Sequence, residues 1–404
     1  MNSFTIYTPT RIFFGADRAK SFAEATAQFG KHALVITGGG SVKRLGILDT
    51  VAAALTDAGL TLSFFSGIEP NPEAATINRA AAQLRTDKAD FVVAVGGGSV
   101  IDAAKAVAAL VHAGEADIWP FVVGEHRAGQ LNGALPIVAV PTTAATASEV
   151  TPFSVISNRT VAGKSVLAAE FLKPRVAWLN PHHTVSLSVT TTQDGAADIL
   201  SHVLESYLLG GNDSPLADRY SEGVIATVLE TLPRLLRQPD DVVARGVLQW
   251  ASTLALNDYQ QAGRRDSQLV LHFMQHALSG QRPSLAHGRG LAALYPAYFR
   301  WLLKHNRAQE RLAQLGARLF AIAGDQKTQA EEFVNRFEQW LSANGLLQSL
   351  YDLGFVDADF PAVADYAVKV YGGGKPLDAL GELPVSEIVE IFKATASQGW
   401  AARN

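Results

Sequence analysis

Residues 91–107, FVVAVGGGSVIDAAKAV, join five β-prone apolar residues to a glycine-rich turn and a helical run. This order is typical of a βα unit whose strand is buried in a parallel sheet. It recurs along the first part of the chain, where β-rich runs cover residues 33–37, 61–65, 91–95, 136–140 and 175–179. Strands that alternate with helices favour an α/β fold, and we predict a domain with a parallel, doubly wound sheet for residues 1–182.

The β-rich runs stop after residue 182, and helical patterns follow one another. We expect helices at residues 193–209, 216–236, 241–261, 267–279, 289–304, 308–323, 328–343 and 385–398. The sequence therefore predicts an all-helical second domain, residues 183–404. A crevice between two such domains is a usual place for a ligand, so we expect the functional site there.

Composition restricts the function. Of the 404 residues, 48% are hydrophobic and 18% are charged, as in ordinary globular enzymes. The net charge of −4 argues against a nucleic-acid binder, which would carry a basic surface. Because the chain has no cysteine, disulfides, thiolate ligands and a cysteine nucleophile are excluded. Any bound metal must be held by histidines and carboxylates.

The first residues, MNSFTIYTPTRIFFG, lack a basic segment followed by an apolar core, and no run of 18 apolar residues occurs. We therefore expect no signal peptide and no membrane span. A cytoplasmic location fits these features.

Two glycine-rich turns are candidates for phosphate binding. Gly97 and Gly98 allow close backbone approach to the helix that begins near Ser99, whose free N–H groups attract phosphate. The motif is neither the G-x-G-x-x-G fingerprint nor a Walker loop, so a tight turn capped by Ser99 is an equal alternative. In the second turn, TGGGSVKRLG (37–46), no carboxylate follows the strand.

A carboxylate at that strand end often selects NAD by binding the ribose hydroxyls. Here Gly38, Gly39, Ser41 and Lys43 leave room and positive charge for a 2′-phosphate, although a plain turn with solvated basic residues is the alternative. A third segment, PTTAATASEVTPFSV (141–155), is rich in hydroxyls. Its threonines either contact the nucleotide or cap a loop; they are Thr142, Thr143 and Thr146.

Histidines and one aspartate form a possible metal-binding set. Asp198 and His202 are four residues apart, as are His272 and His276, so each pair projects from one face of a helix. His287 follows eleven residues later. One carboxylate and three imidazoles suit Fe²⁺ or Zn²⁺. Each pair taken alone is more often a surface or core feature than a ligand set.

These motifs together resemble the iron-containing (group III) alcohol dehydrogenases, especially their NADPH-dependent butanol dehydrogenase and aldehyde reductase branch. The resemblance covers nearly the whole chain, through TPTRIFFG, GGGSVKRLGILD, GIEPNP, AVGGGSVIDAAKA, PTTAATASEVTPFSVI, DILSHVLESY and HGRGLAALYP. It implies a Rossmann-like domain followed by a helical domain, an architecture similar to that of dehydroquinate synthase.

The resemblance also assigns site residues. It implies a metal held by Asp198, His202, His272 and His287, with His276 facing the substrate and assisting catalysis. It implies nucleotide contacts from Gly97, Gly98, Ser99, Asp102, Thr142, Thr143, Thr146, Lys164 and Leu179. The chain departs from the family pattern at three positions where glycine, glycine and aspartate are usual; they are Ala145, Ala147 and Asn180.

We therefore expect metal-dependent hydride transfer between NADP(H), with NAD(H) as a possible substitute, and a small alcohol or aldehyde. The partners expected are this small molecule and a second copy of the chain in a homodimer, with no nucleic acid and no membrane. A glycerol or polyol dehydrogenase of the same fold is one alternative, and a nucleotide-binding protein without turnover is another. A dehydroquinate-synthase-like lyase is disfavoured because its additional lysine and arginine phosphate ligands are not evident.

Overall fold

The computed structural model describes residues 1–397, which divide into two compact units. The first, called here the sheet unit, comprises Tyr7–Leu187 and Asp240–Thr253. The second, called the helical unit, comprises Met1–Ile6, Ser188–Pro239 and the chain from Leu254 onward. Two short segments, Met1–Ile6 and Asp240–Thr253, therefore group with the unit that is distant from them in sequence.

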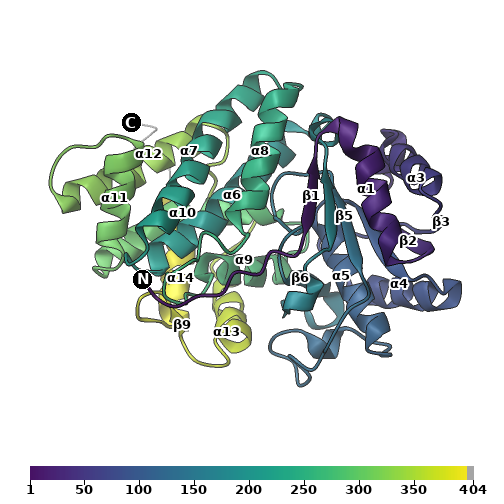
Figure 1. Ribbon diagram of the computed structural model, residues 1–404. Coiled ribbons are helices and arrows are strands. Elements are labelled where there is room, and N and C mark those ends of the chain that lie inside the picture. The colour runs from purple at the N-terminus through teal and green to yellow at the C-terminus, as the bar shows by residue number, and fades with distance from the viewer. Residues whose placement is uncertain (398–404) are drawn as a thin grey trace. The chain divides into compact units, whose positions relative to one another are not determined.

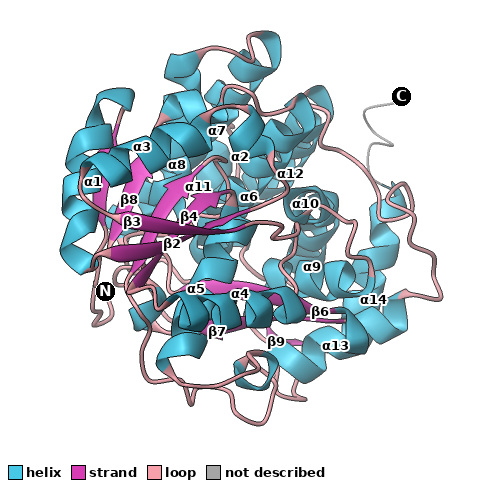
Figure 2. Ribbon diagram, turned by 90° about the vertical axis from the view of Figure 1, so that its right-hand side faces the viewer, coloured by secondary structure: helices cyan, strands magenta, loops and turns pink. Residues whose placement is uncertain are grey.

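The sheet unit contains six parallel strands in the order β1-β8-β5-β4-β2-β3. Figure 2 labels four of them, β8, β4, β2 and β3. The strands are β1 (Arg11–Phe14), β2 (His32–Thr37), β3 (Thr61–Phe65), β4 (Phe91–Gly96), β5 (Ile137–Pro141) and β8 (Val176–Leu179). Successive residues of a strand point to opposite faces, and helices cover both faces, so the central strands are apolar throughout. The parallel α/β sheet predicted from the sequence is confirmed.

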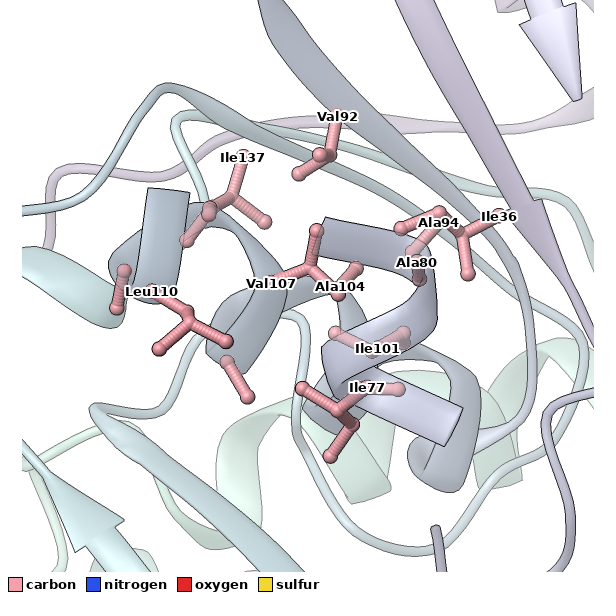
Figure 3. Packing of buried hydrophobic residues seen from close by; sticks show 14 of the residues in the cluster. Ile36, Ile77, Ala80, Val92, Ala94, Ile101, Ala104, Val107, Leu110 and Ile137 are labelled. Carbon is pink, nitrogen blue, oxygen red and sulfur yellow. The ribbon is translucent and has the colours of Figure 1, made fainter. Parts of the chain in front are cut away.

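Each face of the sheet has its own apolar core. On one face, α1 (Ala19–Thr26) and α3 (Ile47–Asp57) contribute Phe22, Val51 and Leu55. The other face is covered by α4 (Ala74–Asp87) and α5 (Gly98–His112), and Figure 3 shows Ile77 of α4 and Ile101 of α5 there among strand residues. Burying one such side chain contributes roughly 1.5–3 kcal/mol, so these contacts hold the helices on the strands.

Several elements were not expected from the sequence. The strand β1 lies at one edge of the sheet, beside β8. An antiparallel hairpin, β6 (Phe153–Asn158) and β7 (Gly163–Ala168), lies against α5. Short strands β9 (Leu377–Asp378) and β10 (Glu382–Leu383) occur in the helical unit. These strands are too short or too polar to produce a clear alternation of apolar and polar residues in the sequence.

The helical unit packs α6 against α7 and α10, and α9 against α10 and α13 (Figure 1). Its helices are α6 (Val189–Leu209), α7 (Pro215–Arg237), α9 (Val270–Gln281), α10 (His287–Lys304), α11 (Gln309–Leu319), α12 (Gln326–Ala343), α13 (Phe360–Tyr371) and α14 (Val385–Ala394). Residue 398, the expected end of the last helix, lies outside the described residues. None of the helices in residues 1–397 has the length and hydropathy that a membrane crossing requires.

The helix expected at residues 241–261 is shorter. It is α8 (Val242–Ala255), and the chain turns after it. Asp258 has a φ of 75° and Gly263 a φ of 73°, left-handed conformations that an α-helix cannot contain. The expectation was wrong at this end because the apolar pattern continues through a turn.

Candidate metal and nucleotide sites

Three helices of the helical unit bring the predicted metal ligands together. Asp198 and His202 lie one turn apart on α6, His272 lies on α9, and His287 is the first residue of α10. Ligand atoms of Asp198, His202 and His272 all lie within 4.8 Å of one another, and the three residues are buried. The Nε2 atom of His287 is 3.3 Å from Asp198 Oδ1.

The carboxylate oxygen of Asp198 is the centre of this group. Its Oδ1 atom lies 3.6 Å from His202 Nε2 and 3.7 Å from His272 Nε2. Ligands about 2.0–2.2 Å from one tetrahedral ion are themselves roughly 3.3–3.6 Å apart, which is close to these separations. Asp198 Oδ1 and His272 Nε2 are buried without a hydrogen bond to any described residue. Because unsatisfied buried polar atoms are costly, the four residues fit a divalent ion.

Charge also suits a cation at this position. Burial opposes ionisation of Asp198, but its contacts with the surrounding imidazoles hold the pKa of its carboxyl well below the usual range. Burial lowers the pKa of His202 to about 3, so this ring is neutral and presents a lone pair. An ionised carboxylate and a neutral imidazole are the forms that bind metals.

His276 lies beside the metal-binding group. Its ring centroid is 5.2 Å from that of His287 and 6.0 Å from that of His272. Tyr371 of α13 lies with its hydroxyl oxygen 3.2 Å from His276 Nδ1, and its ring stacks on Phe273 at 4.5 Å. The arrangement fixes the orientation of His276 but does not by itself assign it a role.

Two residues that the sequence analysis did not single out contact the histidines. A carboxylate oxygen of Glu205 hydrogen-bonds to Nδ1 of His272, and the side-chain oxygen of Gln275 hydrogen-bonds to Nδ1 of His287. Helical spacing could have identified both. Glu205 follows His202 by three residues and Gln275 follows His272 by three, so each shares a helix face with a predicted ligand.

In the sheet unit, the glycine turn and the threonine-rich loop are in contact. A Cβ atom on Gly97 would lie 3.2 Å from the side chain of Thr143, and one on Gly98 would overlap Thr146. The Thr142 amide donates a hydrogen bond to the carbonyl of Gly96, 2.9 Å away. The glycines are therefore required by close approach of this loop to the N-terminal end of α5.

A residue absent from the sequence-based set connects two members of it. The backbone N–H of Asn71 donates to Ser99 Oγ at 3.3 Å, and Asn71 Oδ1 accepts from Lys164 Nζ at 2.8 Å. Asn71 has a φ of 57°, a conformation that asparagine tolerates better than most residues. The sequence GIEPNP could have indicated a turn at Asn71, because Asn-Pro sequences favour turns.

Asp102 is directed into the protein. Its carboxylate accepts hydrogen bonds from Ser148 Oγ and from the Val155 amide, the latter at 3.0 Å. Burial raises the pKa of Asp102, while Lys105, whose Nζ is 4.0 Å from Oδ1, opposes this increase. These contacts anchor the segment that carries Ser148 and Val155. A direct contact of Asp102 with a cofactor stays a prediction.

The remaining predicted nucleotide residues lie at the ends of two strands. Gly38 and Gly39 follow β2, and a Cβ atom on Gly39 would have no neighbour within 4 Å. Ser41 and Lys43 belong to the short helix α2 (Ser41–Arg44) and are exposed. Leu179 ends β8 and is fully buried in the sheet core. The structure thus groups the turn, the loop and Lys164 in one unit and the metal-binding residues in the other.

Comparison with known proteins gives one family along most of the chain. The family profile described as iron-containing alcohol dehydrogenase matches residues 9–181. The profile described as Fe-containing alcohol dehydrogenase family, C-terminal, matches residues 192–396. The two matches together cover both the nucleotide-side motifs and the histidine-rich helices.

Individual relatives are similar over their full lengths. The chain is 33% identical to the probable NADH-dependent butanol dehydrogenase 1 of Bacillus subtilis, over 98% of this chain and 100% of the relative. It is 32% identical to the NADPH-dependent aldehyde reductase YqhD of Escherichia coli, over 90% and 92% respectively. Among solved structures, NADH-dependent butanol dehydrogenase A from Thermotoga maritima aligns with a TM-score of 0.92 at 32% identity, covering 98% of this chain and 99% of that one.

Proposed function

The chain belongs to the iron-containing alcohol dehydrogenase family, and we propose that it transfers a hydride between NADP(H) and a small alcohol or aldehyde. The observation that carries this proposal is the group in which the Nε2 atoms of buried His202 and His272 and of half-buried His287 surround one carboxylate oxygen of Asp198. The relatives support the chemistry, since those named above are butanol dehydrogenases and an aldehyde reductase.

We propose that Asp198, His202, His272 and His287 hold one ion, Fe²⁺ or Zn²⁺. When bound, the ion supplies Lewis-acid stabilisation of the charge that develops on the substrate oxygen, an effect worth several kcal/mol. The family name supports iron. His276 is placed beside this group and is oriented through Nδ1 by Tyr371. We assign His276 the transfer of a proton at Nε2 between substrate oxygen and solvent, as imidazoles do near neutral pH.

The substrate class follows from the surroundings of His276. Most apolar residues of α9, such as Leu271 and Met274, are fully buried and form helix core. Phe273 is only partly buried, and its ring stacks on Tyr371 beside His276. These rings form an apolar wall suited to an alkyl chain, whose burial contributes about 0.8 kcal/mol per methylene. We therefore propose small aliphatic aldehydes and primary alcohols as substrates.

The test measures kcat/KM for the reduction of aldehydes from acetaldehyde to hexanal with NADPH. The same assay is repeated with a chelator and with the His272→Ala variant. We expect kcat/KM to rise with chain length, and the chelator and the substitution to remove both the ion and most activity. Glycerol is the contrasting substrate, because a clear preference for it would favour the polyol dehydrogenase alternative. Full metal content and turnover in His272→Ala would refute the proposed site, and absence of any turnover would favour a nucleotide-binding protein.

We propose that the cofactor is NADP(H) rather than NAD(H). The relatives include both NADH- and NADPH-dependent enzymes, so the preference must come from this chain's own residues. No carboxylate follows β2, the position of Gly39 is open, and Lys43 is exposed nearby in sequence. A 2′-phosphate would therefore meet no repulsion here.

Replacing Gly39 by aspartate should reverse this preference. The new carboxylate would repel the 2′-phosphate and could bind the ribose hydroxyls of NADH. We expect kcat/KM for NADPH to fall roughly ten- to hundredfold, about 1.4–2.8 kcal/mol, while that for NADH rises. Gly39→Asn is the matched control, since it adds the same volume without charge. A wild type that favours NADH, or equal effects of both variants, would contradict the assignment.

We further propose that the protein is a cytoplasmic homodimer. We also propose that its domains divide after residue 182, into residues 1–182 and 183–404, apart from the two short segments that group with the other unit. Light scattering on the purified protein tests the dimer. A monomer at the concentrations used for assay would exclude the dimer.

A further inference from the structure

Glu205 is buried on α6, on the same helix face as Asp198 and His202, and only 2% of its surface is exposed. Both of its carboxylate oxygens contact the start of α9. Oε2 accepts a hydrogen bond from the Leu271 amide at 2.7 Å and a longer one from the His272 amide at 3.4 Å. Oε1 is paired with His272 Nδ1. One carboxylate thus holds both the backbone and the ring of His272.

The backbone contacts replace a missing helix cap. Helix α9 begins after Leu269, which supplies no side-chain hydrogen bond to the first turn. The first N–H groups of a helix have no partner within the helix, and they are usually satisfied by a capping side chain. Here the acceptor comes from another helix, so the end of α9 is tied directly to α6.

The ring contact sets the proton position on His272. Because a carboxylate can only accept, it pairs with a protonated Nδ1 and leaves the lone pair on Nε2. Nε2 is the atom that lies 3.7 Å from Asp198 Oδ1 and has no hydrogen-bond partner in residues 1–397. The contact therefore directs Nε2 toward Asp198, and Nε2 is the nitrogen that would bind an ion while Nδ1 donates to Glu205.

From this geometry we propose that Glu205 is a positioning residue, which fixes the orientation and tautomer of His272 for metal binding and caps α9 in the same contact. The inference rests on the proposed metal site and concerns a residue outside the ligand set.

The other two histidines are held differently. His287 pairs through Nδ1 with the neutral amide of Gln275, and His202 Nδ1 has no hydrogen bond within the described part of the chain. Charge-assisted hydrogen bonds are roughly twice as strong as neutral ones, so His272 is the most firmly oriented of the three. Loss of Glu205 should consequently affect the ion more than loss of Gln275.

The test is Co²⁺ and Zn²⁺ binding to purified Glu205→Gln, measured by titration and by the visible spectrum of the Co²⁺ protein. A glutamine has one acceptor oxygen, so its NH₂ group must face either His272 Nδ1 or the donors of α9. We expect the Kd for the ion to rise about 10–100-fold and the Co²⁺ spectrum to change. Glu205→Asp, which keeps both acceptors on a shorter side chain, should recover part of the affinity.

Glu222→Gln is the matched control. Glu222 is also a buried helical carboxylate of the helical unit, but it pairs with Tyr207 and Arg318. The Glu222→Gln substitution should lower the stability of the protein without changing the Kd for either ion or the Co²⁺ spectrum. Equal Co²⁺ affinity and identical spectra in Glu205→Gln and wild type would overturn the role of Glu205 alone. Failure of the wild type to bind either ion would overturn the metal site and this inference together.

Discussion

Ala147 is a residue in an unfavourable backbone conformation. Its φ is 51° and its side chain is buried. The left-handed region costs a non-glycine residue roughly 1–2 kcal/mol. The strain lies next to Ser148, whose hydroxyl binds Asp102, so it falls at the edge of the proposed nucleotide site.

Two glycine substitutions in the same loop should therefore differ in stability. Ala145 has no positive φ, and Ala145→Gly should only lose chain stiffness and packing. Ala147→Gly also removes a fully buried methyl group, at about 0.8 kcal/mol, but it relieves the strain, so it should be more stable than Ala145→Gly by up to about 1 kcal/mol. Urea unfolding of both variants measures the difference. A lower stability of Ala147→Gly than of Ala145→Gly would contradict strain at Ala147.

His183 makes the sheet unit sensitive to acid. Burial, with a smaller contribution from His182, lowers the pKa of His183 to about 4. In an unfolded chain the pKa of histidine is about 6.5, so the unfolded state takes up the proton first as the pH falls. Stability that is fully present above about pH 6.5 is thus lost progressively down to about pH 4.

Replacing His183 by glutamine should flatten this dependence. The wild-type free energy of unfolding should fall by up to about 1.4 kcal/mol per pH unit more steeply than that of the variant between pH 6.5 and 4. Chemical unfolding at a series of pH values gives both curves. His182→Gln, at an exposed neighbouring position, serves as control. Parallel curves for wild type and His183→Gln would refute the prediction.

At the scale of elements, the start of α10 is shaped by two glycines. A Cβ atom on Gly288 would overlap the carbonyl oxygen of Asp194 on α6, and one on Gly290 would lie 2.9 Å from the side chain of Gln275 on α9. Arg289, between them, donates to Asp194 Oδ1 at 2.8 Å. The sequence HGRG therefore lets three helices meet at the point where His287 joins the metal-binding group.

Gly288→Ala should separate α10 from α6. Overpacking of this kind typically costs about 1–3 kcal/mol, and here it would also move His287 away from Asp198. We expect lower thermal stability together with weaker Zn²⁺ binding. Gly223→Ala on α7 is the control, because a Cβ atom there has no neighbour within 4 Å. It should be neutral or stabilising by up to about 1 kcal/mol. Unchanged Zn²⁺ affinity in Gly288→Ala would contradict the packing argument.

At the scale of the whole molecule, the two proposed ligands bind to different units. The metal-binding residues belong to α6, α9 and α10 of the helical unit, and the phosphate-binding candidates belong to the sheet unit. A ligand that binds only the folded state stabilises the part that holds it, by about 2.7 kcal/mol at a hundred times its Kd. Each ligand should therefore protect its own unit.

Hydrogen exchange can measure this division. Zn²⁺ should slow amide exchange in α6, α9 and α10, and NADPH should slow it around Gly97 and Gly98 and around residues 38–43. Mg²⁺, which prefers oxygen ligands, is the control ion and should protect neither region. Protection of the glycine turns by Zn²⁺ alone, or absence of protection there with NADPH, would contradict the assignment of the sites.

The sequence by itself determined the parallel sheet and most helices, because buried strands and amphipathic helices leave local periodic patterns, and its motifs indicated the family. The resemblance of its motifs to a family also pointed to Asp198, His202, His272 and His287 as metal ligands, and the structure places these four side chains together. Only the tertiary structure revealed β1, the β6–β7 hairpin and the polar residues that orient the histidines. Helical spacing places Glu205 on the face of His202, but its contact with His272 spans 67 positions of the chain, and no local pattern encodes that pairing. The same holds for Gly288, whose lack of a side chain matters only because α6 lies against it.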